Sequence, residues 1–131
     1  MKILFFIDNL GSGGAQSQFV SLAVALLNRG YQVSFFTYFN NVFFARVLDN
    51  HDIKNHKVIK KNKLGLNVIR GLADHCNELK PDIVISQLNT PNFYAACSRK
   101  LCKHPYKLVV VHGSKTNYHK VNIPFFIIFN L

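Results

Sequence analysis

Three glycines stand close together at positions 11, 13 and 14, directly behind an apolar run at residues 2–7. Glycine lets the backbone approach a ligand closely and aim its N–H groups at it. A helix that begins there adds about half a positive charge at its amino end. Such a loop suits a phosphate group, and the alternative is a tight turn from strand to helix that binds nothing.

Two common phosphate-binding patterns do not fit these glycines. The dinucleotide pattern G-x-G-x-x-G would need a glycine where Gln16 stands, and no acidic residue ends the second apolar run to hold a ribose. The P-loop pattern needs a Lys followed by Ser or Thr behind the glycines, and none follows them. Nicotinamide, flavin and ATPase chemistry are therefore disfavoured, and no cofactor is predicted.

The spacing of apolar residues predicts the elements that would position this loop. Continuous apolar or β-branched runs indicate strands, and apolar residues at helical spacing indicate helices. We expect strands at residues 2–7, 32–39, 57–61, 82–88 and 107–113. We expect helices at residues 15–27, 42–48, 66–79 and from 89 to about 103. Gly30 would end the first helix, and Asn89 or Thr90 would cap the last one, with Pro91 at its first position.

Strands that alternate with helices predict an α/β fold. We expect a Rossmann-like, doubly wound parallel sheet of order 3-2-1-4-5 with helices on both faces. In that order the ligand crevice lies outside the carboxyl ends of strands 1 and 4, where the winding reverses. The glycines would then face Asn89 and Thr90, with His112 nearby at the end of the fifth strand.

Composition narrows the class of protein. The chain has 131 residues, enough for one domain, and its 16 Lys and Arg against 6 Asp and Glu give a net charge of +10. Such a surface attracts polyanions, anionic lipid headgroups or phosphorylated substrates. The three cysteines have no framework spacing and no partners for a zinc site, so we predict no metal and a reducing compartment. No signal peptide or membrane-spanning run is visible, which predicts a cytoplasmic protein.

Residues 1–38 resemble the start of family-4 glycosyltransferases of the GT-B fold. These enzymes open with a strand, a Gly-Gly-Ala loop followed by Glu or Gln, and a helix that ends in Leu…Arg-Gly-His-x-Val. The matching residues here are Gly13, Gly14, Ala15, Gln16, Leu26, Arg29, Gly30 and Val33. The stretches at 81–96 and 107–114 continue the resemblance, which reaches to about residue 120.

The resemblance implies an enzyme that moves a sugar from a nucleotide-sugar donor to an acceptor, in the cleft between two Rossmann-like domains. Residues 1–120 match the amino-terminal, acceptor-binding domain. The amides of Gly13 and Gly14 would approach the donor diphosphate. His112 matches the family's histidine at the end of this strand and would act as the catalytic residue, beside the transferring sugar or its developing charge.

Polar side chains at the expected crevice could bind the acceptor. Gln16, Asn89 and Thr90 could form hydrogen bonds with acceptor hydroxyls, and helix capping is the competing role for the last two. Asp8 is the only acidic residue near the expected crevice, so a role as general base is a further possibility.

Residues 121–131 form an apolar tail that we expect to begin a helix leading towards a donor-binding domain. The residues of that second domain do not occur in the sequence, so we expect negligible transfer by the 131-residue chain. The expected partners are a nucleotide-sugar donor and a glycan or lipid-linked acceptor, with peripheral contact at the inner face of a membrane. The alternative is a non-catalytic basic module that binds a polyanion, although no nucleic-acid-binding motif is present.

Overall fold

The computed structural model describes residues 1–112 and 125–129, with side chains described as far as Val111. Five strands, β1 to β5, are parallel, and a sixth, β6, is antiparallel to β5 in the order β3-β2-β1-β4-β5-β6. The strands are β1 (Lys2–Phe6), β2 (Gln32–Thr37), β3 (Lys54–Lys57), β4 (Ile83–Gln87), β5 (Lys107–His112) and β6 (Phe125–Phe129). The helices are α1 (Gly14–Asn28), α2 (Ala45–Asn50), α3 (Leu66–Leu79) and α4 (Asn89–Leu101).

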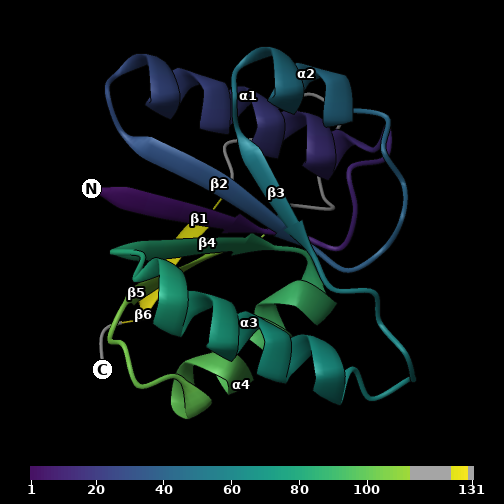
Figure 1. Ribbon diagram of the computed structural model, residues 1–131, viewed down its shortest axis with the longest axis vertical. Helices are drawn as coiled ribbons and strands as arrows, with labels where there is room; N and C mark the ends of the chain where they lie inside the picture. Colours follow the sequence, from purple (N-terminus) through teal and green to yellow (C-terminus); the bar gives the residue numbers. More distant parts are fainter. Residues whose placement is uncertain (113–124, 130–131) are drawn as a thin grey trace.

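The sheet separates two layers of helices. Figure 1 shows α1 and α2 on one face of the sheet, and α3 and α4 on the other. The chain therefore winds in one direction from β1 to β3 and in the other from β4 to β5, which confirms the Rossmann-like, doubly wound fold and the predicted order 3-2-1-4-5 for the parallel strands. The reversal lies between β1 and β4, which are neighbours in the sheet.

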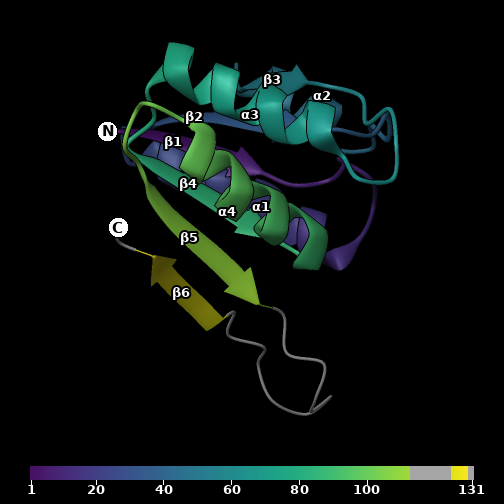
Figure 2. The same cartoon turned by 90° about the horizontal axis from the view of Figure 1, so that it is seen from below.

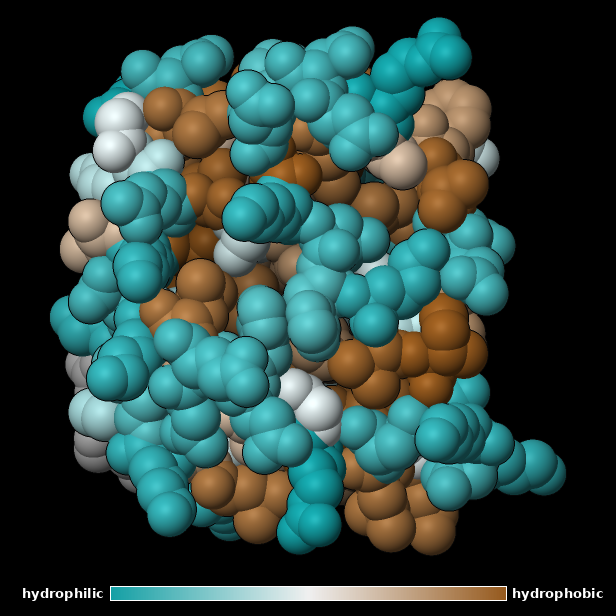
Figure 3. Space-filling model, in the orientation of Figure 1, coloured by the Kyte–Doolittle hydropathy of each residue, from teal (hydrophilic) through white to brown (hydrophobic). Residues whose placement is uncertain are grey.

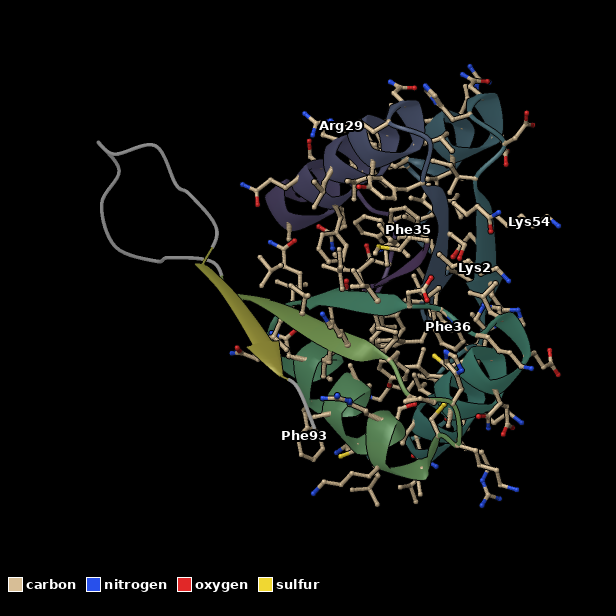
Figure 4. All side chains as sticks on the ribbon, turned by 90° about the vertical axis from the view of Figure 1, so that its left-hand side faces the viewer. Lys2, Arg29, Phe35, Phe36, Lys54 and Phe93 are labelled. Atoms are coloured by element: carbon tan, nitrogen blue, oxygen red, sulfur yellow. The ribbon has the colours of Figure 1, made fainter. Side chains whose placement is uncertain are left out.

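Paired phenylalanines explain why the centre of the sheet is stable. Phe5 and Phe35 are register partners whose rings stack at 5.2 Å, and Phe6 and Phe36 are partners on the opposite face at 5.6 Å. Figure 4 shows Phe35 and Phe36 on opposite sides of the sheet, as expected for successive residues of a strand. All four side chains are fully buried, so each face receives an aromatic pair worth about 0.5–1.5 kcal/mol beyond its buried area.

The third strand and the second helix differ most from the sequence prediction. The third strand is Lys54–Lys57 and not residues 57–61, because backbone pairing with β2 defines this edge strand while its side chains stay largely exposed. The short second helix is Ala45–Asn50 and not residues 42–48. Apolar spacing is a poor guide to an edge strand, since such a strand buries little of its surface.

The carboxyl-terminal prediction was wrong in its secondary structure. Residues 125–129, expected to lie in the beginning of a helix, form β6, which pairs antiparallel with β5 (Figure 2). Five successive β-branched or aromatic residues favour a strand, and the free edge of β5 offers a partner for its backbone. Among the described residues, no helix combines the length and apolar character needed to span a membrane.

Candidate active-site crevice

The candidate site lies at the turns that follow β1 and β4, where the winding of the sheet reverses. Both turns lead from the carboxyl end of a strand into a helix, and the two helices cover opposite faces of the sheet. The structure therefore brings the glycine loop and the residues after β4 to the same end of the sheet, as predicted. Ligands of open α/β sheets bind at this position.

The turn after β1 is built around a hydrogen-bonded set of polar side chains. Oδ1 of Asp8 accepts hydrogen bonds from the Asn9 amide at 2.8 Å and from Nε2 of Gln16 at 3.1 Å. Oδ1 of Asn9 accepts one from the Gly11 amide at 2.7 Å. Gln16 is buried and holds the first turn of α1 against the loop, a positioning contact that the sequence did not reveal. The Asp8 carboxylate is anchored by these bonds.

The two adjacent glycines of the loop differ in what surrounds them. Gly13 is the N-cap of α1 in an extended conformation, and a Cβ there would overlap Oε1 of Gln16. Gly14 begins the helix, is exposed, and would have nothing within 4 Å of a Cβ. The fold therefore explains the absence of a side chain at Gly13 but not at Gly14. The open space at Gly14 leaves the amino end of α1 accessible to a ligand.

The turn after β4 is strained and does not use the predicted cap. Leu88 occupies the N-cap position with φ 79° and ψ 152°, a region used almost solely by glycine, and it makes no side-chain capping bond. Asn89 and Thr90 lie inside α4 and are exposed, and Pro91 is the third helical residue. The predicted capping role of Asn89 or Thr90 was wrong, because the helix starts at Asn89, two residues before the predicted first position at Pro91.

Two buried amides flank this strained residue. Asn92 accepts a 2.7 Å hydrogen bond from the Ser86 hydroxyl and donates to the Val111 carbonyl at 3.4 Å, so it joins β4, α4 and β5. Gln87 is 3% exposed, and its Nε2 donates to Oε1 of Gln18 at 3.4 Å, whereas its own Oε1 has no partner. Sequence reasoning missed Gln87, although a glutamine closing a buried apolar strand is an unusual residue there.

The predicted catalytic histidine can be placed only by its backbone. His112 is the last residue of β5 and the register partner of Phe125 in β6. Its imidazole lies outside the side chains that the structure describes, so the catalytic role of His112 stays a prediction.

Burial perturbs several titratable side chains near the sheet, and Tyr38 and His75 are two of them. Burial and the neighbouring Asp8 raise the pKa of Tyr38, which follows β2, so its phenol stays neutral. Burial and the stacked ring of His56, at 4.2 Å, lower the pKa of His75 to about 4. His75 is half-buried, and its ring stacks on His56 of β3, so it belongs to the fold.

The cysteines do not form a metal site in the described part of the chain. Cys76 is buried in α3, and burial raises the pKa of its thiol. The thiol of Cys102 donates to Oδ1 of Asn77 at 3.2 Å. Within residues 1–112 and 125–129, no three His, Cys, Asp or Glu side chains are grouped so that they could hold a metal ion.

Comparison with known proteins decides the family. The sequence profile of Glycosyltransferase Family 4 matches residues 12–127, nearly the whole chain. The chain belongs to Glycosyltransferase Family 4. No curated protein matches the sequence of this family-4 domain significantly.

Solved structures share the fold of the family-4 domain at low identity. HepE (Alr3699) of Anabaena, solved with UDP, has a TM-score of 0.67 and 20% identity, covering 92% of this chain and 32% of that one. The lipopolysaccharide outer core galactosyltransferase WaaB has a TM-score of 0.68 and 21% identity, covering 84% of this chain and 32% of its own. The domain thus spans about a third of the length of these structures.

The same fold also occurs in an enzyme of another class. The UDP-GlcNAc 2-epimerase of Neisseria meningitidis, solved with UDP-GlcNAc, has a TM-score of 0.66 and 19% identity, covering 91% of this chain and 34% of that one. Fold alone therefore does not separate sugar transfer from epimerisation, and the assignment to transferases depends on the family match.

Proposed function

We propose that this family-4 domain is the acceptor-binding half of a glycosyltransferase that uses a nucleotide-sugar donor. In that reaction the bond from the anomeric carbon to the diphosphate breaks, a bond to an acceptor hydroxyl forms, and the hydroxyl loses its proton. Negative charge grows on the departing nucleoside diphosphate, so fixed N–H donors beside it stabilise the transition state. HepE was solved with UDP, and the epimerase with UDP-GlcNAc, which supports a donor of this class.

The observation that carries the proposal is the unexplained glycine at the amino end of α1. Gly14 is exposed, has free space where a Cβ would stand, and lies at the reversal of winding. Its neighbour Gly13 presents an exposed backbone in the same loop. We assign both glycines to one wall of the donor diphosphate site, with His112 as the catalytic residue and the exposed Asn89 and Thr90 near the acceptor. Gln16, which is buried and bonded to Asp8, supports this wall and does not reach the acceptor.

The diphosphate wall can be tested with inorganic pyrophosphate. In the ¹⁵N-labelled 131-residue protein, we expect saturable shifts of the backbone amides of residues 12–17. Gly14→Ala should weaken this binding at least tenfold because the new methyl group fills the approach to the helix. Asn28→Ala, at the other end of α1, is the control and should bind as the wild type does. Equal binding by Gly14→Ala would overturn the assignment.

The same titration separates the proposal from a general polyanion-binding module. In that alternative, shifts would be confined to the lysine-rich residues 54–63, would vanish with salt and would leave the glycine loop unchanged. We also expect the 131-residue chain to show no sugar transfer from UDP-sugars to glycan acceptors, and measurable transfer would contradict this expectation.

A lipid-linked acceptor would explain the exposed apolar side chains at the carboxyl end of the sheet. Exposed apolar side chains follow the carboxyl ends of β2, β3 and β4, at Phe39, Phe43, Leu64, Leu88 and Phe93. Figure 3 shows brown hydrophobic areas interrupted by hydrophilic groups in teal on the face that it presents. With the nearby lysines, this composition suits an anionic membrane surface. Phe43→Ser should reduce sedimentation with anionic phospholipid vesicles, and Tyr31→Ser, exposed at the other end of the sheet, should not.

A further inference from the structure

A cavity lies beside the glycine loop, between α1 and the ends of β4 and β5. Its volume is about 330 Å³, at the lower end of the range for small-molecule sites. One wall comes from the first half of α1 and the other from the sheet. The lining residues are Ser17, Gln18, Phe19, Ser21, Leu22, Gln87 and Val111.

The sheet side of the cavity contains the unpartnered amide oxygen. Gln87 and Val111 are register partners on neighbouring strands, so an amide and an apolar side chain lie next to each other on one face. Gln87 is 97% buried, and its Oε1 has no hydrogen bond. A buried acceptor without a donor costs about 1–3 kcal/mol in general. Its retention at the edge of a cavity indicates a ligand that donates to it.

Gln87 can turn its oxygen to a ligand at little cost. Within the described part of the chain, its Nε2 donates only to Oε1 of Gln18, at 3.4 Å, which is beyond the usual length of such a bond. The terminal torsion of a glutamine side chain has a broad, roughly two-fold profile. Rotation about this torsion to its second favoured orientation would exchange Oε1 and Nε2, turn the oxygen towards Gln18 in the cavity wall, and break the 3.4 Å contact.

The helix side supplies hydroxyls and an apolar surface. Ser17 and Ser21 are four residues apart and exposed on α1, so their hydroxyls lie on one face of the helix. Leu22 adds an apolar contact opposite Val111. Among the described residues that line the cavity, none carries a charge, although the chain has a net charge of +10. The ligand that fits is neutral, has several hydroxyls and has one apolar face, and these are the properties of a pyranose ring.

We infer that this cavity binds a neutral sugar ring of the glycan acceptor, with a sugar hydroxyl donating to Oε1 of Gln87. The inference rests on the proposed function, since the cavity begins one helical turn from Gly14 and so lies beside the proposed diphosphate wall. A sugar held there would have a hydroxyl within reach of the reacting carbon, whereas the diphosphate would stay at the glycine loop.

The test is a titration of the ¹⁵N-labelled 131-residue protein with methyl glycosides of glucose, galactose and N-acetylglucosamine, each to about 50 mM. At least one sugar should give saturable shifts at residues 17–22, 87 and 111. Gln87→Leu should weaken that binding at least tenfold and at the same time raise the melting temperature, because it removes the unpaired buried oxygen. Gln32→Leu is the matched control, since Gln32 is exposed at the start of β2, and it should leave binding unchanged.

Each result has a definite meaning. No saturable shift with any of the three sugars, or equal sugar binding by Gln87→Leu, would overturn the inference. Pyrophosphate added to the same samples tests the glycine loop separately. Sugar binding without pyrophosphate binding would keep the cavity as a sugar site and reject the diphosphate wall, and the reverse would reject the cavity alone.

Discussion

The turns after β1 and β4 perform the same task in opposite ways. The turn after β1 passes into α1 through Gly13 with an ordinary backbone conformation, and its side chains Asp8, Asn9 and Gln16 satisfy one another. The turn after β4 passes into α4 through Leu88 in a conformation that suits glycine, beside the unpaired oxygen of Gln87. One turn is relaxed and internally bonded, and the other is strained and incompletely bonded.

The difference indicates which contacts each turn leaves for a ligand. In the first turn the side chains are occupied by the fold, so the backbone at Gly14 is what remains available. In the second turn a side-chain oxygen remains available, and the strain persists because the surrounding structure holds it. Exposed backbone N–H groups suit an anion, so the first turn fits the donor diphosphate. A neutral side-chain amide suits a hydroxyl, so the second turn fits the acceptor.

The largest effect should come from removing the amide that holds the strained turn in place. Asn92→Ala leaves the buried Ser86 hydroxyl without its partner and detaches α4 from β5. We expect the free energy of unfolding to fall by about 2–3 kcal/mol in urea denaturation. Asn89→Ala, at an exposed position in the same helix, should change it by less than about 0.5 kcal/mol. Equal losses in the two variants would show that Asn92 does not support this turn.

Acid should weaken the fold at His75 in α3, outside the two turns. Because the pKa of His75 is lowered to about 4, the unfolded chain binds a proton at higher pH than the folded one does. Stability should therefore fall as pH drops from about 6.5 towards 4, by about 1–2 kcal/mol for a half-buried ring.

Replacement of the ring isolates this acid effect. In His75→Phe, the loss of stability between pH 6.5 and 4 should largely disappear in urea denaturation at several pH values. His51→Gln, at the end of α2 on the other face of the sheet, is the control and should keep the loss. Persistence of the full loss in His75→Phe would assign the acid sensitivity to other groups.

Relief of the strain in the second turn should make it resemble the first. The backbone conformation at Leu88 costs a residue with a side chain about 1–3 kcal/mol, and glycine adopts it without this cost. Glycine in turn loses about 0.5–1 kcal/mol more conformational entropy on folding. For Leu88→Gly we expect a net gain of less than about 1 kcal/mol in the free energy of unfolding, because Leu88 is only 37% exposed and its removal also gives up some apolar burial. A loss of stability would mean that Leu88 is not strained.

The sequence predicted the relaxed turn better than the strained one. The parallel strands β1, β2, β4 and β5 and the helices α1 and α3 follow apolar patterns, because burial selects their residues. The edge strand β3 (Lys54–Lys57) depends on backbone pairing, which leaves little trace in residue type. The positive φ of Leu88 and the unpaired oxygen of Gln87 are set by tertiary packing, so no local pattern could reveal them.

The smallest effects should separate the two glycines of the relaxed turn. In Gly13→Ala the new methyl group displaces the Gln16 amide, so the bond to Asp8 is lost and stability falls by about 1 kcal/mol. In Gly14→Ala the methyl group enters open space at the first residue of α1, so stability should rise by about 0.5 kcal/mol. Thermal unfolding of the two variants measures both changes in stability.

If Gly14→Ala is more stable than the wild type yet no longer binds pyrophosphate, the glycine at this position serves diphosphate binding and not the stability of the fold. A destabilised Gly14→Ala would instead give that glycine a structural cause and remove the main support for the diphosphate wall.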